Sequence, residues 1–189
     1  MGSSPTPGTR DTIHSMKWGL RYSAFAGIVA FLVNVILQYS IPDPARMTGQ
    51  SLSIFFGIFL TYIVFYVAYM YGFAVLGKKF HNSLITYAAY MLIGVNLVLF
   101  AQTFLFGNMS TILSGIVLIV ALSAAVATVV LGWQILNLKK QLGPAAVWYG
   151  SLMLLGITGV IGWIYAPADM IIDDSLFLIG SYLLYKTSR

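Results

Sequence analysis

SLSIFFGIFLTYIVFYVAYMYGFAVLGKK, residues 51–79, is an apolar segment that carries no charge until it ends in two adjacent lysines. A helix needs about 20 mostly apolar residues to cross the roughly 30 Å hydrocarbon core of a bilayer, and this segment is longer than that. Short loops rich in Lys and Arg stay on the cytoplasmic side of a membrane. The segment therefore predicts a transmembrane helix that places Lys78 and Lys79 in the cytoplasm.

Five more segments are largely apolar and of similar length or somewhat shorter, at about residues 18–41, 83–106, 110–138, 145–165 and 169–186. The chain is 59% hydrophobic and only 8% charged, whereas a soluble domain is about a quarter charged. We therefore predict an all-α, polytopic membrane protein, a six-transmembrane-helix bundle that occupies residues 17–189 as a single domain. Residues 1–16, rich in Ser, Pro, Thr and Gly at their start, are expected to form a flexible cytoplasmic tail.

The basic residues mark one side of the predicted membrane. Six crossings place nine of the ten on the side of both termini: Arg10, Lys17, Arg21, Lys78, Lys79, Lys139, Lys140, Lys186 and Arg189. Arg46 falls on the opposite side, together with four of the five acids. Both termini are therefore predicted to be cytoplasmic. We include the short last segment, residues 169–186, as a crossing. Without it, Lys186 and Arg189 would lie outside the cytoplasm, on the same side as the acids.

A weak internal repeat pairs the apolar segments into hairpins. VNVIL at 33–37 recurs as VNLVL at 95–99, an offset of 62 residues (96 minus 34), and the same offset leads from Asn96 to Thr158. Three tandem helical hairpins, related by an axis along the membrane normal, would produce such a pattern. Chance similarity between apolar segments is the alternative.

Two groups of residues are candidates for lining a ligand site or a pore. The first group consists of polar residues at matching predicted depth in the membrane: Asn34, Asn96 and Thr158. The second group forms part of one aromatic face of segment 51–79: Tyr62, Tyr66 and Tyr69. A buried phenol normally has a hydrogen-bond partner, so these groups should not face lipid tails. They would suit a polar ligand, or a lipid, quinone or pigment. The alternative is ordinary hydrogen bonding between neighbouring helices.

Small residues at helical spacing predict close helix contacts. Segment 110–138 carries one such set: Ala121, Ala125, Thr128 and Gly132. Segment 18–41 carries a shorter one: Ala26 and Ala30. Small side chains let helix backbones approach closely in lipid, where no hydrophobic force brings them together. Such faces, and the aromatic face, could pack within the chain or form a homo- or hetero-oligomer. Membrane lipids are the other expected partner.

Several classes of chemistry are excluded or disfavoured. The chain has no Cys and no Glu, and His14 and His81 lie outside the apolar segments, so we expect no metal site and no cofactor. No nucleophile motif or phosphate loop is present, so the protein is predicted not to be an enzyme. The basic residues are scattered in pairs, which disfavours nucleic-acid binding.

Two local features of the outer side have ordinary explanations. Asp169, Asp173 and Asp174 are expected to be solvated residues at a helix end, because a calcium site needs six or more converging oxygen atoms. Asn108, Met109 and Ser110 form a glycosylation sequon in a predicted outer turn, although so short a motif also arises by chance.

The leading functional hypothesis is a non-catalytic structural or accessory subunit of a membrane complex, because no ionisable group is expected within the bilayer. A small-molecule transporter or channel is one alternative, and a binder of an apolar ligand is another. The chain length, the six predicted helices and Ala26-x-x-x-Ala30 resemble the substrate-binding subunits of energy-coupling-factor vitamin transporters. This chain lacks the long external loops that would enclose a vitamin. The resemblance implies a small-molecule binding role.

The predicted topology can be tested by cysteine labelling, since the chain has no Cys of its own. In intact cells, Asn108→Cys should react with a membrane-impermeant thiol reagent, whereas Lys140→Cys should react only after the membrane is opened. The positive-inside bias provides the physical reason. Labelling of position 140 but not of position 108 in intact cells would contradict the predicted orientation.

Overall fold

The computed structural model describes residues 7–40, 49–105, 111–158 and 166–189. These residues form seven helices and contain no β-strand. The helices are α1 (Pro7–Ser40), α2 (Gln50–Lys79), α3 (Ser83–Leu105), α4 (Thr111–Asn137), α5 (Lys139–Leu142), α6 (Pro144–Thr158) and α7 (Ala166–Thr187). The prediction of an all-α protein is confirmed.

Three of these helices contain stretches that are long and apolar enough to cross a membrane. They are His14–Gln38 in α1, Ser53–Lys79 in α2 and Ile119–Asn137 in α4. Ser83–Leu99 and Pro144–Leu155 are shorter apolar helical stretches. The chain is therefore a helical membrane protein with three candidate spans among its described residues.

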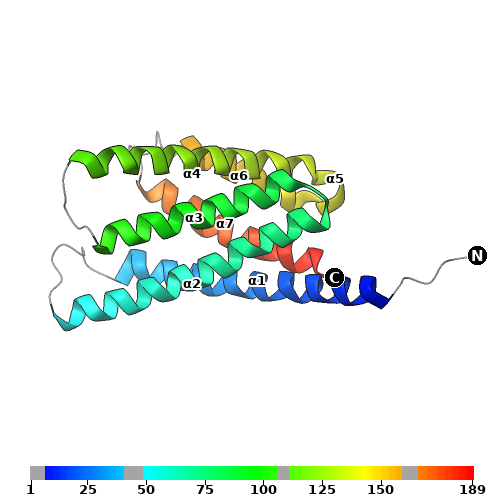
Figure 1. The fold of residues 1–189 in the computed structure, drawn as a ribbon, viewed down its shortest axis with the longest axis horizontal. Helices are drawn as coiled ribbons and strands as arrows, with labels where there is room; N and C mark the ends of the chain where they lie inside the picture. Colours follow the sequence, from blue (N-terminus) through cyan, green and yellow to red (C-terminus); the bar gives the residue numbers. More distant parts are fainter. Residues whose placement is uncertain (1–6, 41–48, 106–110, 159–165) are drawn as a thin grey trace, which may run out of the picture.

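The six long helices form a closed ring in chain order. α1 packs on α2, α2 on α3, α3 on α4, α4 on α6, α6 on α7, and α7 returns to α1. Consecutive long helices run in alternating directions (Figure 1). Short connections between helices favour such antiparallel neighbours. In this ring α2 lies between α1 and α3.

The segments that carry most of the basic residues gather at one end of the bundle. The turn between α2 and α3, the short helix α5 and the C-terminal end of α7 all lie at the right in Figure 1. The ammonium group of Lys17 donates to the carbonyl of Arg189 at 3.2 Å, and that of Lys186 donates to the carbonyl of Leu142 at 3.3 Å. Lys17 and Lys186, which are far apart in the sequence, therefore both form hydrogen bonds at this end of the bundle.

Two helix boundaries differ from the sequence predictions. α1 begins at Pro7, so the helix includes the second part of the segment 1–16, which had been predicted as a flexible tail. Proline suits the first helical position because its fixed φ is already helical and it lacks the N–H that would have no partner there. α7 begins at Ala166, so Asp173 and Asp174 lie inside the helix rather than at its end.

Close approach between helices depends on glycines. A Cβ added at Gly72 of α2 would lie 2.5 Å from Cβ of Ser23 on α1 and 2.7 Å from Cδ1 of Leu184 on α7. A Cβ added at Gly150 of α6 would lie 2.6 Å from the carbonyl oxygen of Gly132 on α4. All three distances are shorter than van der Waals contact, so the helices could not pack this closely with larger residues.

Gly150→Ala is therefore expected to destabilise the protein by about 1–3 kcal/mol, the usual cost of adding a methyl group to a packed core. Gly94→Ala is the matched control, because a Cβ at Gly94 has no neighbour within 4 Å. Alanine favours a helix over glycine by roughly 1 kcal/mol, so the control should be as stable as the wild type or more stable. Thermal unfolding in detergent compares the two variants. Equal melting temperatures would contradict the packing described for α4 and α6.

Candidate functional site

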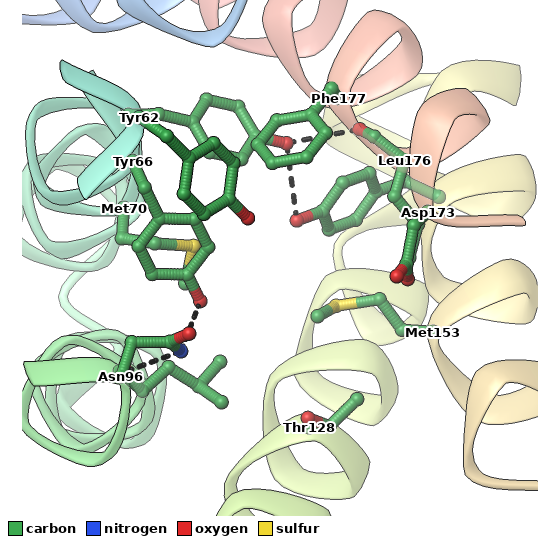
Figure 2. A pocket seen from close by; sticks show the side chains of 12 residues that line it. Tyr62, Tyr66, Met70, Asn96, Thr128, Met153, Asp173, Leu176 and Phe177 are labelled. Carbon is green, nitrogen blue, oxygen red and sulfur yellow. Dashed lines mark hydrogen bonds between the residues drawn. The ribbon is translucent and has the colours of Figure 1, made fainter. Parts of the chain in front are cut away.

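A cavity of about 220 Å³ lies within the helix ring. Five helices contribute to its wall, namely α2, α3, α4, α6 and α7. The lining residues are Tyr62, Tyr66, Tyr69, Met70, Leu92, Asn96, Thr128, Tyr149, Met153, Asp173, Leu176 and Phe177. Figure 2 shows Tyr62, Tyr66 and Asn96 on one side of this space, and Met153 and Asp173 on the opposite side.

Aromatic rings from two helices form one part of the wall. Tyr62 and Tyr66 lie one turn apart on α2, with ring centroids separated by 5.9 Å. Phe177 of α7 meets both rings edge-on, each at 6.3 Å and 79°. These distances and angles lie in the range that attractive aromatic pairs adopt. The rings therefore hold α2 and α7 in register at the cavity.

Hydrogen bonds hold the polar groups of the wall. Asn96 of α3 donates through Nδ2 to the hydroxyl of Tyr66 at 3.0 Å and to the carbonyl of Leu92 at 3.0 Å. The hydroxyl of Tyr69 donates to the carbonyl of Leu176 at 3.0 Å and lies 3.4 Å from the hydroxyl of Tyr149. Three of the phenols, Tyr66, Tyr69 and Tyr149, thus have protein partners, as buried polar groups require.

Two carboxylates lie on different faces of α7. Asp173 lines the cavity, while Asp174 accepts a hydrogen bond of 3.1 Å from Nδ2 of Asn34 on α1. Consecutive residues of an α-helix point about 100° apart, so one acid can face the cavity while the next faces α1. Both acids lie inside α7 rather than at its end, and Asp173 is exposed whereas Asp174 is half-buried.

The acids of α7 lie far from its basic end. Asp173 is thirteen positions from Lys186 (186 minus 173), which corresponds to about 20 Å of helix. α7 begins at Ala166, so both acids lie more than one turn inside the helix. α7 is not among the three candidate spans of the described residues.

The structure brings together some of the predicted site residues and separates others. Tyr62, Tyr66, Tyr69 and Asn96 all line the cavity. Asn34 bonds to Asp174 instead, because α2 lies between α1 and α3 in the ring. The expected convergence of the two asparagines is therefore not seen. Thr158 ends α6, and its side chain lies outside the described residues, as does the sequon at Asn108.

The residues predicted for helix contacts lie in different surroundings. Ala26 and Ala30 are buried. On α4, Ala121 is exposed and Ala125 is half-buried. Gly132 is buried, and a Cβ there would lie 2.9 Å from Cβ of Met153 on α6.

Thr128, also predicted as an interface residue, is half-buried and lines the cavity. Its hydroxyl donates to the carbonyl of Ala124 one turn earlier at 2.9 Å. On the small-residue face of α4, Gly132 therefore packs within the chain, and Thr128, one turn before it, borders the cavity.

Sequence reasoning missed Asp173, Phe177, Tyr149 and Met153 as site residues. Asp173 and Phe177 are four residues apart, a spacing that places both on one helix face, and this could have signalled a shared environment. Tyr149 is 1% exposed, and its ring stacks on Phe73 with centroids 5.0 Å apart.

Among the described residues, no three His, Cys, Asp or Glu side chains lie together as a metal site would require. The cavity instead combines aromatic rings, two thioethers, one amide, hydroxyl groups and one carboxylate. Such a wall is suited to binding a small molecule through apolar contact and a few polar groups. No known family, curated protein or solved structure matches this chain in the comparisons. Inference about function therefore rests on this geometry.

Tyr66→Phe should lower the stability of the protein by about 1 kcal/mol, because Asn96 loses one hydrogen-bond acceptor but keeps the carbonyl of Leu92. Tyr87→Phe is the matched control, since Tyr87 lies on α3 and is 69% exposed. Thermal unfolding in detergent measures both. A Tyr66→Phe protein as stable as the control would show that the bond contributes nothing to folding, and would leave the hydroxyl available for a ligand.

Proposed function

We propose that this chain is a membrane protein with six crossings and cytoplasmic termini that binds a small molecule within its helix ring, as a carrier or receptor does. The observation that carries the proposal is the cavity, where phenols, an amide and a carboxylate from four helices and a threonine hydroxyl from a fifth converge. The gathering of lysine-bearing segments at one end of the bundle supports the orientation.

The size of the cavity favours a small ligand. Sites for drug-sized molecules measure roughly 300–1,000 Å³, whereas this cavity measures about 220 Å³. A pigment or a whole lipid would not fit in such a space. A compact molecule with a few polar atoms would fit, with the rings of Tyr62 and Phe177 as apolar walls.

The acids of α7 also favour a ligand-binding role. A charged side chain at the centre of a membrane helix costs about 2.5–3.5 kcal/mol on insertion scales, and such residues usually mark substrate or ion pathways. The hypothesis of an accessory subunit depended on the absence of ionisable groups from the apolar segments. Asp173, inside α7 and on the cavity wall, weakens that premise.

A structural or accessory subunit is the second candidate. Ala121 is exposed on α4 while Gly132 of the same small-residue face is buried, so part of that face is open to a partner helix. Native mass spectrometry of the purified protein would show a second chain if this role is the main one.

Filling the cavity tests the proposal. Thr128→Phe should place a ring in the cavity, and Val126→Phe places the same ring on an exposed position of α4, 58% accessible in the wild type. Purified proteins are compared by mass spectrometry of co-purified small molecules and by thermal shifts with a panel of small cations, anions and neutral compounds. We expect ligand retention or stabilisation in the wild type and Val126→Phe, reduced about tenfold or more in Thr128→Phe. If no compound distinguishes the two variants, the cavity is not a binding site.

A further inference from the structure

We propose that the basic end of the helix bundle binds an anionic phospholipid. Its phosphate would lie beside Lys78, Lys79 and His81, and one acyl chain would lie in an apolar groove formed by α1, α2 and α3. Neither of these two hollows shares a lining residue with the cavity inside the helix ring. The lipid site is therefore separate from the site of the proposed function and is tested separately.

A cavity of about 240 Å³ lies at the basic end of the bundle, between α1 and the turn that follows α2. None of its six lining residues is an acid: Met16, Lys17, Leu20, Lys78, Lys79 and His81. The one acid that the sequence places on this side, Asp11, lies six positions before Lys17, about 9 Å along α1. Lys17 and Lys79 lie close enough for their positive charges to repel each other. A hollow with several positive groups and no acid in its wall favours an anion.

The lysines of this cavity keep donors for a bound anion. Lys78 is exposed and has no hydrogen-bond partner among the described residues. Lys79 donates to the carbonyl of Thr187, which is a neutral acceptor, and an ammonium group has three donors. Lys17 contacts a main-chain oxygen of Arg189. We therefore assign the phosphate to Lys78 and Lys79.

His81 occupies a backbone conformation that favours glycine, with φ +53°. The amides of His81 and Asn82 donate to the carbonyls of Lys78 and Gly77 at 3.3 and 2.8 Å, the pattern of a helix end that usually places glycine where His81 stands. The turn itself does not need an imidazole. Backbone strain of this kind collects at functional sites, and here it places a histidine side chain in the wall of the basic cavity.

An apolar groove of about 490 Å³ follows the same helix faces away from the basic end. Lys78 lies seven positions after Tyr71 on α2, which is two turns along one face. Met16 lies three positions before Gly19 on α1, again on one face. The groove therefore begins next to the basic cavity. Its lining residues are Gly19, Tyr22, Ser23, Val64, Val67, Ala68, Tyr71, Tyr90 and Ile93.

This arrangement matches the shape and chemistry of a phospholipid. Val64 lies fourteen positions before Lys78 (78 minus 64), or about 21 Å of helix, which is enough to follow one leaflet from its headgroups into the hydrocarbon. Val64 and Tyr71 are exposed, so the groove is open to the surroundings of the bundle. Basic pockets between membrane helices bind the headgroups of anionic lipids. The cationic headgroup of a zwitterionic lipid would be repelled by the same lysines.

The positive-inside bias explains the sign of the charge at this end, but it does not require lysines and a histidine to share one cavity. Lys139 and Lys140 of α5 satisfy the same bias and lie outside both the cavity and the groove. The two pairs of lysines therefore separate a lipid site from a general effect of charge.

Native mass spectrometry of the full-length protein in a non-ionic detergent tests the inference. The probes are phosphatidylglycerol and phosphatidylcholine with the same acyl chains, added in equal amounts, because both contain a phosphodiester and they differ in net charge. We expect the wild type to retain phosphatidylglycerol about tenfold or more over phosphatidylcholine, and Lys78→Gln to reduce this ratio about threefold or more. Equal retention of the two lipids by the wild type overturns the inference, whatever the variants do.

Lys140→Gln is the matched control, because it removes the same charge from another exposed lysine at this end. It should leave the ratio nearly unchanged, and an effect as large as that of Lys78→Gln would overturn the assignment to the cavity. His81→Gly should also lower the ratio, while the melting temperature stays equal or rises, because glycine adopts this φ without strain. An unchanged ratio in this variant overturns the role of His81.

Soluble phosphates distinguish a lipid site from a site for a free anion. Glycerol 3-phosphate and inorganic phosphate, added at millimolar concentration, should not displace phosphatidylglycerol from the wild type, because neither has a chain to occupy the groove. Displacement by either compound would overturn the lipid assignment and show that the basic cavity binds a soluble phosphate.

Filling the groove tests the position of the acyl chain. Val64→Trp places a large ring in the groove, and Val126→Trp places the same ring on α4, where the wild-type residue is equally exposed at 58%. Only Val64→Trp should reduce the amount of retained phosphatidylglycerol, by about fivefold or more. Equal retention in the two variants overturns the assignment of the chain to this groove.

Discussion

The insertion of Tyr69 between α1 and α7 is the contact on which the closed ring depends. Its side chain is 3% exposed and packs against Gly27 of α1 and Gly180 of α7. A methyl group at either glycine would overlap the ring or the hydroxyl group of Tyr69. The hydroxyl also donates to the carbonyl of Leu176, so one side chain combines close packing with a satisfied polar group. In lipid, where apolar faces do not attract one another by the hydrophobic effect, such packing and hydrogen bonding hold helices together.

This contact also determines what surrounds the cavity. With Tyr69 against α7, the aromatic face of α2 turns toward the helix that carries Asp173 and Phe177. Tyr66 and Tyr62, which lie one and two turns away from Tyr69 on the same face, then border the cavity together with Asn96 of α3. The contact of Tyr69 with α7 thus helps both to close the ring of helices and to set which residues line the cavity. A site held on packed helices can keep its groups in place before a ligand arrives.

The polar groups of α7 show how an apolar bundle can contain acids. Asp174 is bonded by Asn34, whereas Asp173 stays accessible at the cavity. An amide donor reduces the cost of burying a carboxylate because it replaces part of the lost hydration. The hydrogen bond between Asn34 and Asp174 therefore links α1 to α7. Asn34 is not among the residues that line this cavity, because its amide contacts Asp174 of α7.

The sequence alone determined the helices, because a run of apolar residues must satisfy its own backbone hydrogen bonds in lipid. Segments 83–106 and 110–138 match α3 and α4 within one residue at each end. The aromatic face of α2 was also visible from its spacing. Only the tertiary structure decided that Asp173, Phe177 and Tyr149 join that face, and that Asn34 does not. These helices are apolar on nearly every side, so periodicity does not indicate which face meets which neighbour. That choice depends on the fit of glycines and rings between helices far apart in the chain.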